Sequence, residues 1–213
     1  LADFRDPWTQ IYFFNQLHMS FLAKRMHRKL EMSVLKQADA IVTVSKHCGA
    51  GLAKISGRDV KVITNGYEEF QIKQTERTDE KIRMLYAGVL SLDRNPIIFW
   101  KLLDQYLQLR TDLKERFELW LIGNIDLSIV EELKNSGLNS SLHVLPSMPQ
   151  RELQTHLALA DLFLLIGVPG HPGVITGKLF ESLYLNKPIY SISPVYSDLG
   201  EILNDPLSGY TAV

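Results

Sequence analysis

The stretch that decides the fold is Gly173–Pro188, which reads GVITGKLFESLYLNKP. The apolar run Asp161–Ile166 stands before it and has the length and content of a buried parallel strand. Between the two lies Gly167–Gly173, a segment rich in glycine and proline, which interrupt regular structure. The sequence therefore predicts a strand that leaves its sheet through a loop.

The second half of the stretch predicts a helix capped by Thr176, because apolar residues recur after it at three- and four-residue spacing. Lys187-Pro188 ends that helix, and Ile189–Ile192 predicts a further strand. The N-terminus of such a helix offers unpaired backbone N–H groups and a positive dipole end, and both favour phosphate. Lys178 and Glu181 flank that terminus from one helical face. The alternative is that they form a surface ion pair, worth about 0.2–0.5 kcal/mol.

The string TGKLFESL at Thr176–Leu183, followed by Lys187–Ile189, resembles the nucleotide-sugar motif of retaining family 4 glycosyltransferases, which have the GT-B fold. The resemblance implies that Glu181 holds the ribose hydroxyls of the donor. The residues of this helix that it implies at the donor diphosphate are Thr176, Gly177 and Lys178.

The resemblance is incomplete at the sugar end of the motif. The family carries a first glutamate that contacts the donor sugar, and Gly173 stands at that position here. Gly173 and the nearby His171 are the candidates for a sugar contact, although His171 also fits an ordinary exposed loop histidine.

A second part of the donor site is expected after the strand Ile82–Ala87. Gly88 would let a ligand approach the backbone at the carboxyl end of that strand. The family usually has an arginine next and a lysine several residues later, both on the diphosphate; here these positions are Val89 and Arg94. Arg94 is therefore a candidate for the diphosphate, and a surface ion pair with Asp93 or Asp104 is its alternative.

Composition sets the broad class. The chain has 213 residues, 46% hydrophobic and 22% charged, with a formal net charge of -1, so it fits a globular protein of one or two domains and gives no sign of nucleic-acid binding. The single cysteine, Cys48, excludes an internal disulfide, and no apolar run approaches a membrane span. The histidines show no metal-ligand spacing, and we expect no cofactor or metal.

The chain divides into three parts by pattern. Residues 67–81 are interpreted as a charged linker, and the strand–helix alternation of 82–213 predicts an α/β, Rossmann-like, doubly wound sheet. The resemblance implies that 1–66 is the last part of a first, acceptor-binding domain and that 82–213 is the donor domain. The start at Leu1 and the stop at Thr211–Val213 lead us to expect a fragment of a longer protein, able to bind nucleotide but inactive alone.

The predicted elements follow from hydrophobic periodicity. In the first part, we expect helices at Ile11–Gln37 and Lys46–Ile55 and strands at Asp39–Ser45 and Val60–Thr64. In the donor domain, we expect strands near Ile82–Ala87, Phe117–Ile122, Leu142–Leu145, Leu162–Ile166 and Ile189–Ile192. Its helices are expected near Pro96–Leu109, Ser128–Ser136, Gln150–Leu159, Gly177–Leu185 and Ser197–Leu203. The opening Arg5–Trp8 resembles a segment that many of these transferases carry after a strand of their acceptor-binding domain. The alternative, which we favour, is a turn built on Asp6-Pro7 with Trp8 as an anchor.

The predicted helix 11–37 carries a compact basic cluster, Lys24–Lys29, beside aromatic residues. A basic amphipathic helix can lie on an anionic membrane, so this segment is a candidate for peripheral contact with the inner face of a membrane. A solvated helix face is the alternative.

The resemblance implies a cytoplasmic enzyme that moves a hexose from a nucleotide diphosphate to a hydroxyl of a sugar or lipid-linked acceptor, with retention, in polysaccharide or glycolipid synthesis. Two alternatives stay open: a sugar-nucleotide 2-epimerase with the same donor pocket, and a non-catalytic nucleotide-binding module. The sequence names no catalytic residue.

Overall fold

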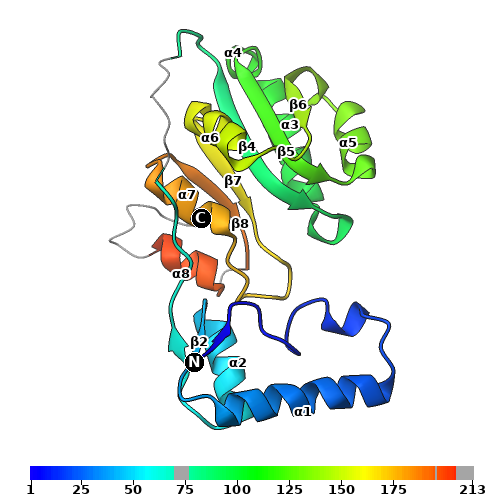
Figure 1. Ribbon diagram of the computed structural model, residues 1–213. Coiled ribbons are helices and arrows are strands. Elements are labelled where there is room, and N and C mark those ends of the chain that lie inside the picture. The colour runs from blue at the N-terminus through cyan, green and yellow to red at the C-terminus, as the bar shows by residue number, and fades with distance from the viewer. Residues whose placement is uncertain (70–76, 195, 205–213) are drawn as a thin grey trace.

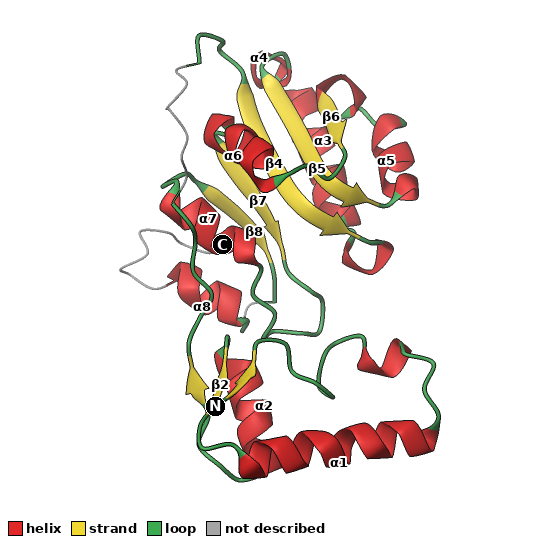
Figure 2. Cartoon of the chain, in the orientation of Figure 1, coloured by secondary structure: helices red, strands yellow, loops and turns green. Residues whose placement is uncertain are grey.

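The computed structural model describes residues 1–69, 77–194 and 196–204. Within these ranges the chain forms a three-stranded sheet and a five-stranded sheet, each of them parallel and flanked by helices (Figures 1 and 2). The predicted α/β class is confirmed.

The smaller sheet is built from β1 (Ala2–Phe4), β2 (Ile41–Thr43) and β3 (Lys61–Val62), in that order. Helix α1 (Phe21–Gln37) and helix α2 (Lys46–Ser56) accompany it. The sequence analysis did not predict β1, which is only three residues long and pairs Ala2 with Ile41. The small core of this part consists of Phe4, Leu35, Ile41 and Leu52.

The predicted helix 11–37 is wrong over its first ten residues, since α1 begins at Phe21. Ser20 caps the N-terminus of this helix, because its Oγ accepts the backbone N–H of Ala23 at 3.2 Å and its own backbone is extended. A short 3-10 turn, η1 (Phe14–Gln16), precedes it, with Phe14 buried. The apolar spacing of this segment therefore reflects packing of an irregular loop.

The larger sheet has the strand order β6-β5-β4-β7-β8. Its strands are β4 (Ile82–Leu90), β5 (Phe117–Ile125), β6 (Leu142–Leu145), β7 (Leu162–Ile166) and β8 (Ile189–Ile192). Its helices are α3 (Ile97–Leu109), α4 (Thr111–Lys114), α5 (Leu127–Lys134), α6 (Gln150–Leu159), α7 (Gly177–Tyr184) and α8 (Asp198–Asn204), with the 3-10 turns η2 (Leu92–Arg94) and η3 (Asn139–Ser141). Each predicted strand and helix of this domain is present, with ends shifted by a few residues.

This sheet is buried on both faces, as its continuous apolar strands require. Along β4, Met84 and Tyr86 pack in one core cluster with residues of α3 and α5, while Leu85 packs in another with Leu153 and Leu157 of α6. The two-residue period of a strand thus divides its side chains between the two helical layers.

The strand order reverses between β4 and β7. The chain moves outward from β4 through β5 to β6 and then returns to the other side of β4 at β7. In open parallel sheets, ligands bind outside the carboxyl ends of the strands at such a reversal. The fold therefore points to the segments that follow Leu90 and Ile166.

The end of the predicted linker is tied to the larger sheet. Arg77 pairs with Asp79 and with Asp161, each at 2.7 Å, and Arg83 pairs with Glu118 at 2.7 Å. Among the causes that act on the Glu118 pKa, burial raises it, but the hydrogen bonds from Arg83 and Trp120 outweigh burial and lower it. Residues 70–76 of the predicted linker lie outside the described residues.

Candidate functional site

The N-terminus of α7 is formed as the sequence predicts. Thr176 is extended and caps the helix, with its Oγ1 accepting the N–H of Lys178 at 3.4 Å. A Cβ placed on Gly177 would meet no atom within 4 Å, so open space lies in front of the first helical residue. That space and the helix dipole make this terminus suitable for an anionic group.

Lys178 and Glu181 form a close pair. The Nζ of Lys178 lies 2.9 Å and 2.7 Å from the two carboxylate oxygens of Glu181, and both side chains are largely shielded, at 23% and 16% exposure. Gln150, at the start of α6, also donates to Glu181 at 3.1 Å. The carboxylate is therefore oriented by two helices, which a simple surface ion pair would not require.

Gly88 and Arg94 lie at the carboxyl edge of the larger sheet. Gly88 is near the end of β4 with a φ of +154°, and Arg94 follows in η2. The guanidinium of Arg94 donates to the carbonyl of Ile166, the last residue of β7, at 2.6 Å and to that of Val89 at 3.4 Å, while its Nε is buried without a partner. Arg94 thus bridges the two strands at the point where their order reverses.

The predicted alternative for Arg94, an ion pair with Asp93 or Asp104, does not form. Asp104 instead accepts the backbone N–H of Gly137 at 3.0 Å and the side-chain amide of Gln108 at 2.9 Å. Arg94 is only partly exposed and is held by main-chain carbonyls instead.

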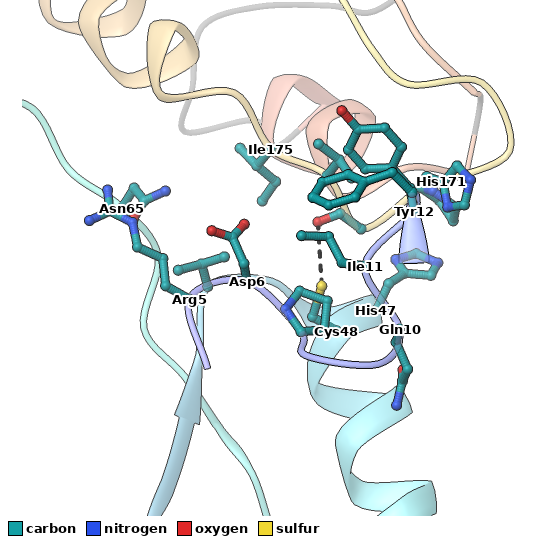
Figure 3. A pocket seen from close by; sticks show the side chains of 16 residues that line it. Arg5, Asp6, Gln10, Ile11, Tyr12, His47, Cys48, Asn65, His171 and Ile175 are labelled. Atoms are coloured by element: carbon teal, nitrogen blue, oxygen red, sulfur yellow. Dashed lines mark hydrogen bonds between the residues drawn. The ribbon is translucent and has the colours of Figure 1, made fainter. Parts of the chain in front are cut away.

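A cavity of about 460 Å³ lies between the two parts of the chain (Figure 3). The loop after β1, the start of α2 and Asn65, which follows β3, line one side, and the loop before α7 lines the other. His171 and Gly173, the two candidates for a sugar contact, are both in its wall. The ring of His171 lies 5.5 Å from that of Tyr12 between centroids.

Gly173 leaves no room for a side chain. A Cβ there would lie 2.9 Å from the Cβ of His47 and 3.2 Å from both Cys48 Sγ and Ser45 Oγ, all at the start of α2. Cys48 Sγ also approaches the Gly173 carbonyl at 3.8 Å. The glycine is therefore explained by close packing between the two domains, and any contact it makes with a sugar would use its backbone.

Burial raises the pKa of the Cys48 thiol, with smaller upward contributions from the carboxylates of Asp198 and Asp6. A hydrogen bond with Ser45 acts in the opposite direction but does not reverse the shift. The cavity wall therefore carries a neutral thiol at this point, not a reactive thiolate.

Several residues of this cavity were not identified as functional from the sequence. They are Arg5, Asp6, Gln10, Tyr12, His47, Cys48 and Asn65. The signal that could have found some of them is the rule used for the larger sheet, since Arg5, Asp6 and His47 follow the carboxyl ends of β1 and β2. Within the described ranges, no group of three or more histidine, cysteine, aspartate or glutamate residues could hold a metal ion.

The sequence matches no protein-family model and no curated protein. The structure, however, is similar to solved glycosyltransferase structures. Over 88% of this chain it matches S. aureus TarM (a mutant in complex with Fondaparinux, alpha-GlcNAc-glycerol and UDP) with a TM-score of 0.62 and 10% identity. It matches Anabaena HepE, solved with UDP and glucose, over 89% with a TM-score of 0.62 and 16% identity. It matches WaaG, a glycosyltransferase of lipopolysaccharide biosynthesis, over 93% with a TM-score of 0.61 and 14% identity.

These structures define the class of fold: parallel sheets flanked by helices, as in GT-B glycosyltransferases. The chain spans 36% of TarM, 51% of HepE and 57% of WaaG. At such low identities the likeness establishes the fold, and the activity has to be argued from the site.

Proposed function

We propose that this chain carries the donor site of a retaining hexosyltransferase of family 4, which moves a sugar from a nucleoside diphosphate to a hydroxyl group. The observation that carries the proposal is the arrangement around the strand reversal. The open N-terminus of α7 and the partly shielded Lys178–Glu181 pair stand on one side, and Arg94 bridges the ends of β4 and β7. A nucleoside diphosphate needs a ribose-binding carboxylate and a cationic phosphate site, and these residues supply both.

In this proposal Glu181 accepts the ribose hydroxyls, while Lys178, Arg94 and the α7 terminus with Thr176 and Gly177 face the diphosphate. As the bond from the sugar to the diphosphate breaks, negative charge grows on the leaving phosphate. Cations and backbone N–H groups fixed near that charge stabilise the transition state without having to reorganise. The acceptor hydroxyl loses its proton to the leaving phosphate oxygen on the same face of the sugar, which gives retention.

The proposal is tested by calorimetric titration of the chain with UDP, ADP and GDP, since the solved relatives TarM and HepE contain UDP. We expect saturable binding of at least one of these diphosphates. Absence of binding to all three would contradict the donor site. Product analysis with a nucleotide sugar and an acceptor, using the longest available form of the protein, then separates a transferase from a 2-epimerase or a non-catalytic module.

We further propose that the acceptor is presented at a membrane surface and that α1 contacts it. No helix within the described residues is long and apolar enough to span a membrane. One face of α1 is nevertheless exposed and apolar along its length, and cations interrupt it at two positions. The apolar residues of this face are Phe21, Leu22, Met26, Leu30 and Val34, and the cations are Arg25 and Lys29. The opposite face, with Ala23, His27, Glu31 and Leu35, is turned inward.

Removing two of these charges should weaken binding to an anionic membrane. Each lysine or arginine near an anionic surface contributes about 1 kcal/mol, so Arg25→Gln with Lys29→Gln should lower vesicle affinity about tenfold or more. The measurement is co-sedimentation with phosphatidylserine-containing vesicles at low and high salt. The matched control is Lys101→Gln with Lys134→Gln, two exposed lysines on helices of the other domain. Equal losses in both pairs, or no binding by the parent chain, would favour a solvated helix face.

A further inference from the structure

The two domains are joined at the first turn of α2. The backbone N–H of His47 donates to Oδ2 of Asp198 at 3.0 Å, and its ring Nδ1 lies 2.6 Å from Oδ1 of the same carboxylate. Next to this pair, Lys46 Nζ lies 2.7 Å from Glu201. Asp198 begins α8, is only 3% exposed, and is separated from His47 by 151 residues of sequence.

This contact fixes the chemistry of the histidine ring. An ionised carboxylate can only accept, so the ring donates to it from Nδ1 and Nε2 is left for another partner. Asp198 therefore selects the tautomer and the orientation of the ring, as carboxylates do for functional histidines elsewhere. The His47 side chain is 41% exposed, and the ring forms part of the cavity wall (Figure 3). Nε2 has no partner among the described residues.

Gly173 is what allows His47 to stand in this position. With a side chain at residue 173, the nearest atoms would be the Cβ of His47 and the Sγ of Cys48, at 2.9 Å and 3.2 Å. The loop before α7 and the start of α2 can pack closely only because Gly173 has no Cβ. The second domain therefore has no side chain at residue 173, and His47 of the first domain lies beside it.

The rest of the cavity favours a neutral, hydroxyl-rich ligand. Asn65 offers an amide, the charges of Arg5 and Asp6 are opposite, and the Tyr12 ring adds an aromatic surface. An amide and an imidazole nitrogen match a hydroxyl, which can both donate and accept, and the balanced charges of Arg5 and Asp6 give no net attraction for a second phosphate.

We propose that His47, held by Asp198 across the domain interface, binds a hydroxyl group of a sugar in this cavity. The hydrogen bond joins the sugar hydroxyl to Nε2. This inference rests on the proposed function and adds to it the residue and the domain that recognise the sugar. The sugar belongs either to the donor or to the acceptor, and both present the same hydroxyl chemistry. In either case the recognition site is complete only while the two domains are docked.

Two substitutions of His47 test the roles of the two ring nitrogens separately. In His47→Asn, the side-chain amide can still donate to Asp198 near the Nδ1 position, but nothing replaces Nε2. In His47→Gln, the longer amide reaches the Nε2 position and loses the Nδ1 contact. The probes are UDP, UDP-glucose, UDP-N-acetylglucosamine and the two free sugars in the presence of UDP, followed by calorimetry and ligand-observed NMR.

We expect His47→Asn to weaken sugar-dependent binding about three- to tenfold, the usual effect of one lost hydrogen bond, while the affinity for UDP stays within twofold. His47→Gln should keep more of the sugar-dependent affinity than His47→Asn, despite the lost contact with Asp198. A loss confined to the UDP-sugars assigns the hydroxyl to the donor, and a loss confined to the free sugars assigns it to the acceptor.

The inference is overturned if His47→Asn leaves all sugar affinities unchanged, or if no sugar-bearing probe binds better than UDP alone and no free sugar binds. A fall in melting temperature of either variant without a change in sugar affinity would show a purely structural role and would also overturn it. If UDP fails to bind the parent chain but a free sugar binds in a His47-dependent way, the proposed donor site fails and the sugar site stands.

Discussion

Replacing Gly123 with alanine is expected to lower the free energy of unfolding by about 2–6 kcal/mol, the sum of backbone strain and overpacking. Gly123 has a φ of +130°, and a Cβ there would lie 2.1 Å from the carbonyl oxygen of Gly88 and 3.0 Å from its carbonyl carbon. Gly88 is its register partner on the neighbouring strand β4. The clashing atoms are backbone, so they can move only by distorting the central pair of strands.

The measurement is urea-induced unfolding of the two variants Gly123→Ala and Gly66→Ala. A Cβ at Gly66 would meet no atom within 4 Å, and Gly66 is not among the glycines with positive φ, so we expect a change within about 0.5 kcal/mol. Equal unfolding free energies for the two variants would contradict the close approach of β4 and β5. A large difference would show that this approach is a requirement of the fold at the edge where Gly88 lies.

Much of the larger domain can be predicted from its sequence. Its strands are short apolar runs between breakers, and β6, β7 and β8 lie at the predicted residues. The same holds for α6, whose amphipathic pattern has no competing signal. Local periodicity is sufficient here because each element is buried against its neighbours in the alternating pattern of a parallel sheet.

The smaller domain was predicted less well for a physical reason. Its strands have two or three residues, too few for a period to appear, so β1 was not predicted and β2 was predicted too long. The helix prediction at 11–37 is right for 21–37 and wrong for 11–20. Apolar residues of the irregular loop continue the spacing of the helix, and only the Ser20 cap marks the true start.

The candidate site also has one part that could be predicted from the sequence and one part that could not. The α7 residues Thr176, Gly177, Lys178 and Glu181 lie on one continuous element, so their relation could be predicted. The contact between His47 and Asp198 joins residues 151 apart in the sequence and depends on how the domains meet. No local sequence pattern predicts how the domains meet. The role of Gly173 in this contact becomes clear only from the atoms around its Cα.

The different parts of a nucleotide can test the roles proposed for Lys178 and Glu181. If Glu181 holds the ribose, Glu181→Ala should weaken the nucleoside and the nucleoside diphosphate alike. If Lys178 holds the diphosphate, Lys178→Met should weaken the diphosphate and leave the nucleoside nearly unchanged. Each lost hydrogen bond to a charged group costs about 1.5–3 kcal/mol, which is about tenfold or more in affinity. The close pair in the structure, with 2.7 Å between Nζ and Oε2, gives either substitution a second effect, because it releases the partner left behind.

Calorimetric titration of uridine and UDP against both variants separates these effects. The matched controls are Lys134→Met and Glu131→Ala, an exposed lysine and glutamate three residues apart on α5. The effect of Lys178→Met on UDP should also shrink at high salt, because salt screens an accessible phosphate contact. If the affinities of Lys178→Met and Glu181→Ala stay within twofold of the parent, as we expect for the α5 controls, the two residues stabilise α7 and the α6 contact only. The donor site would then have to be sought at Arg94 and the strand ends, because the motif helix would carry no ligand.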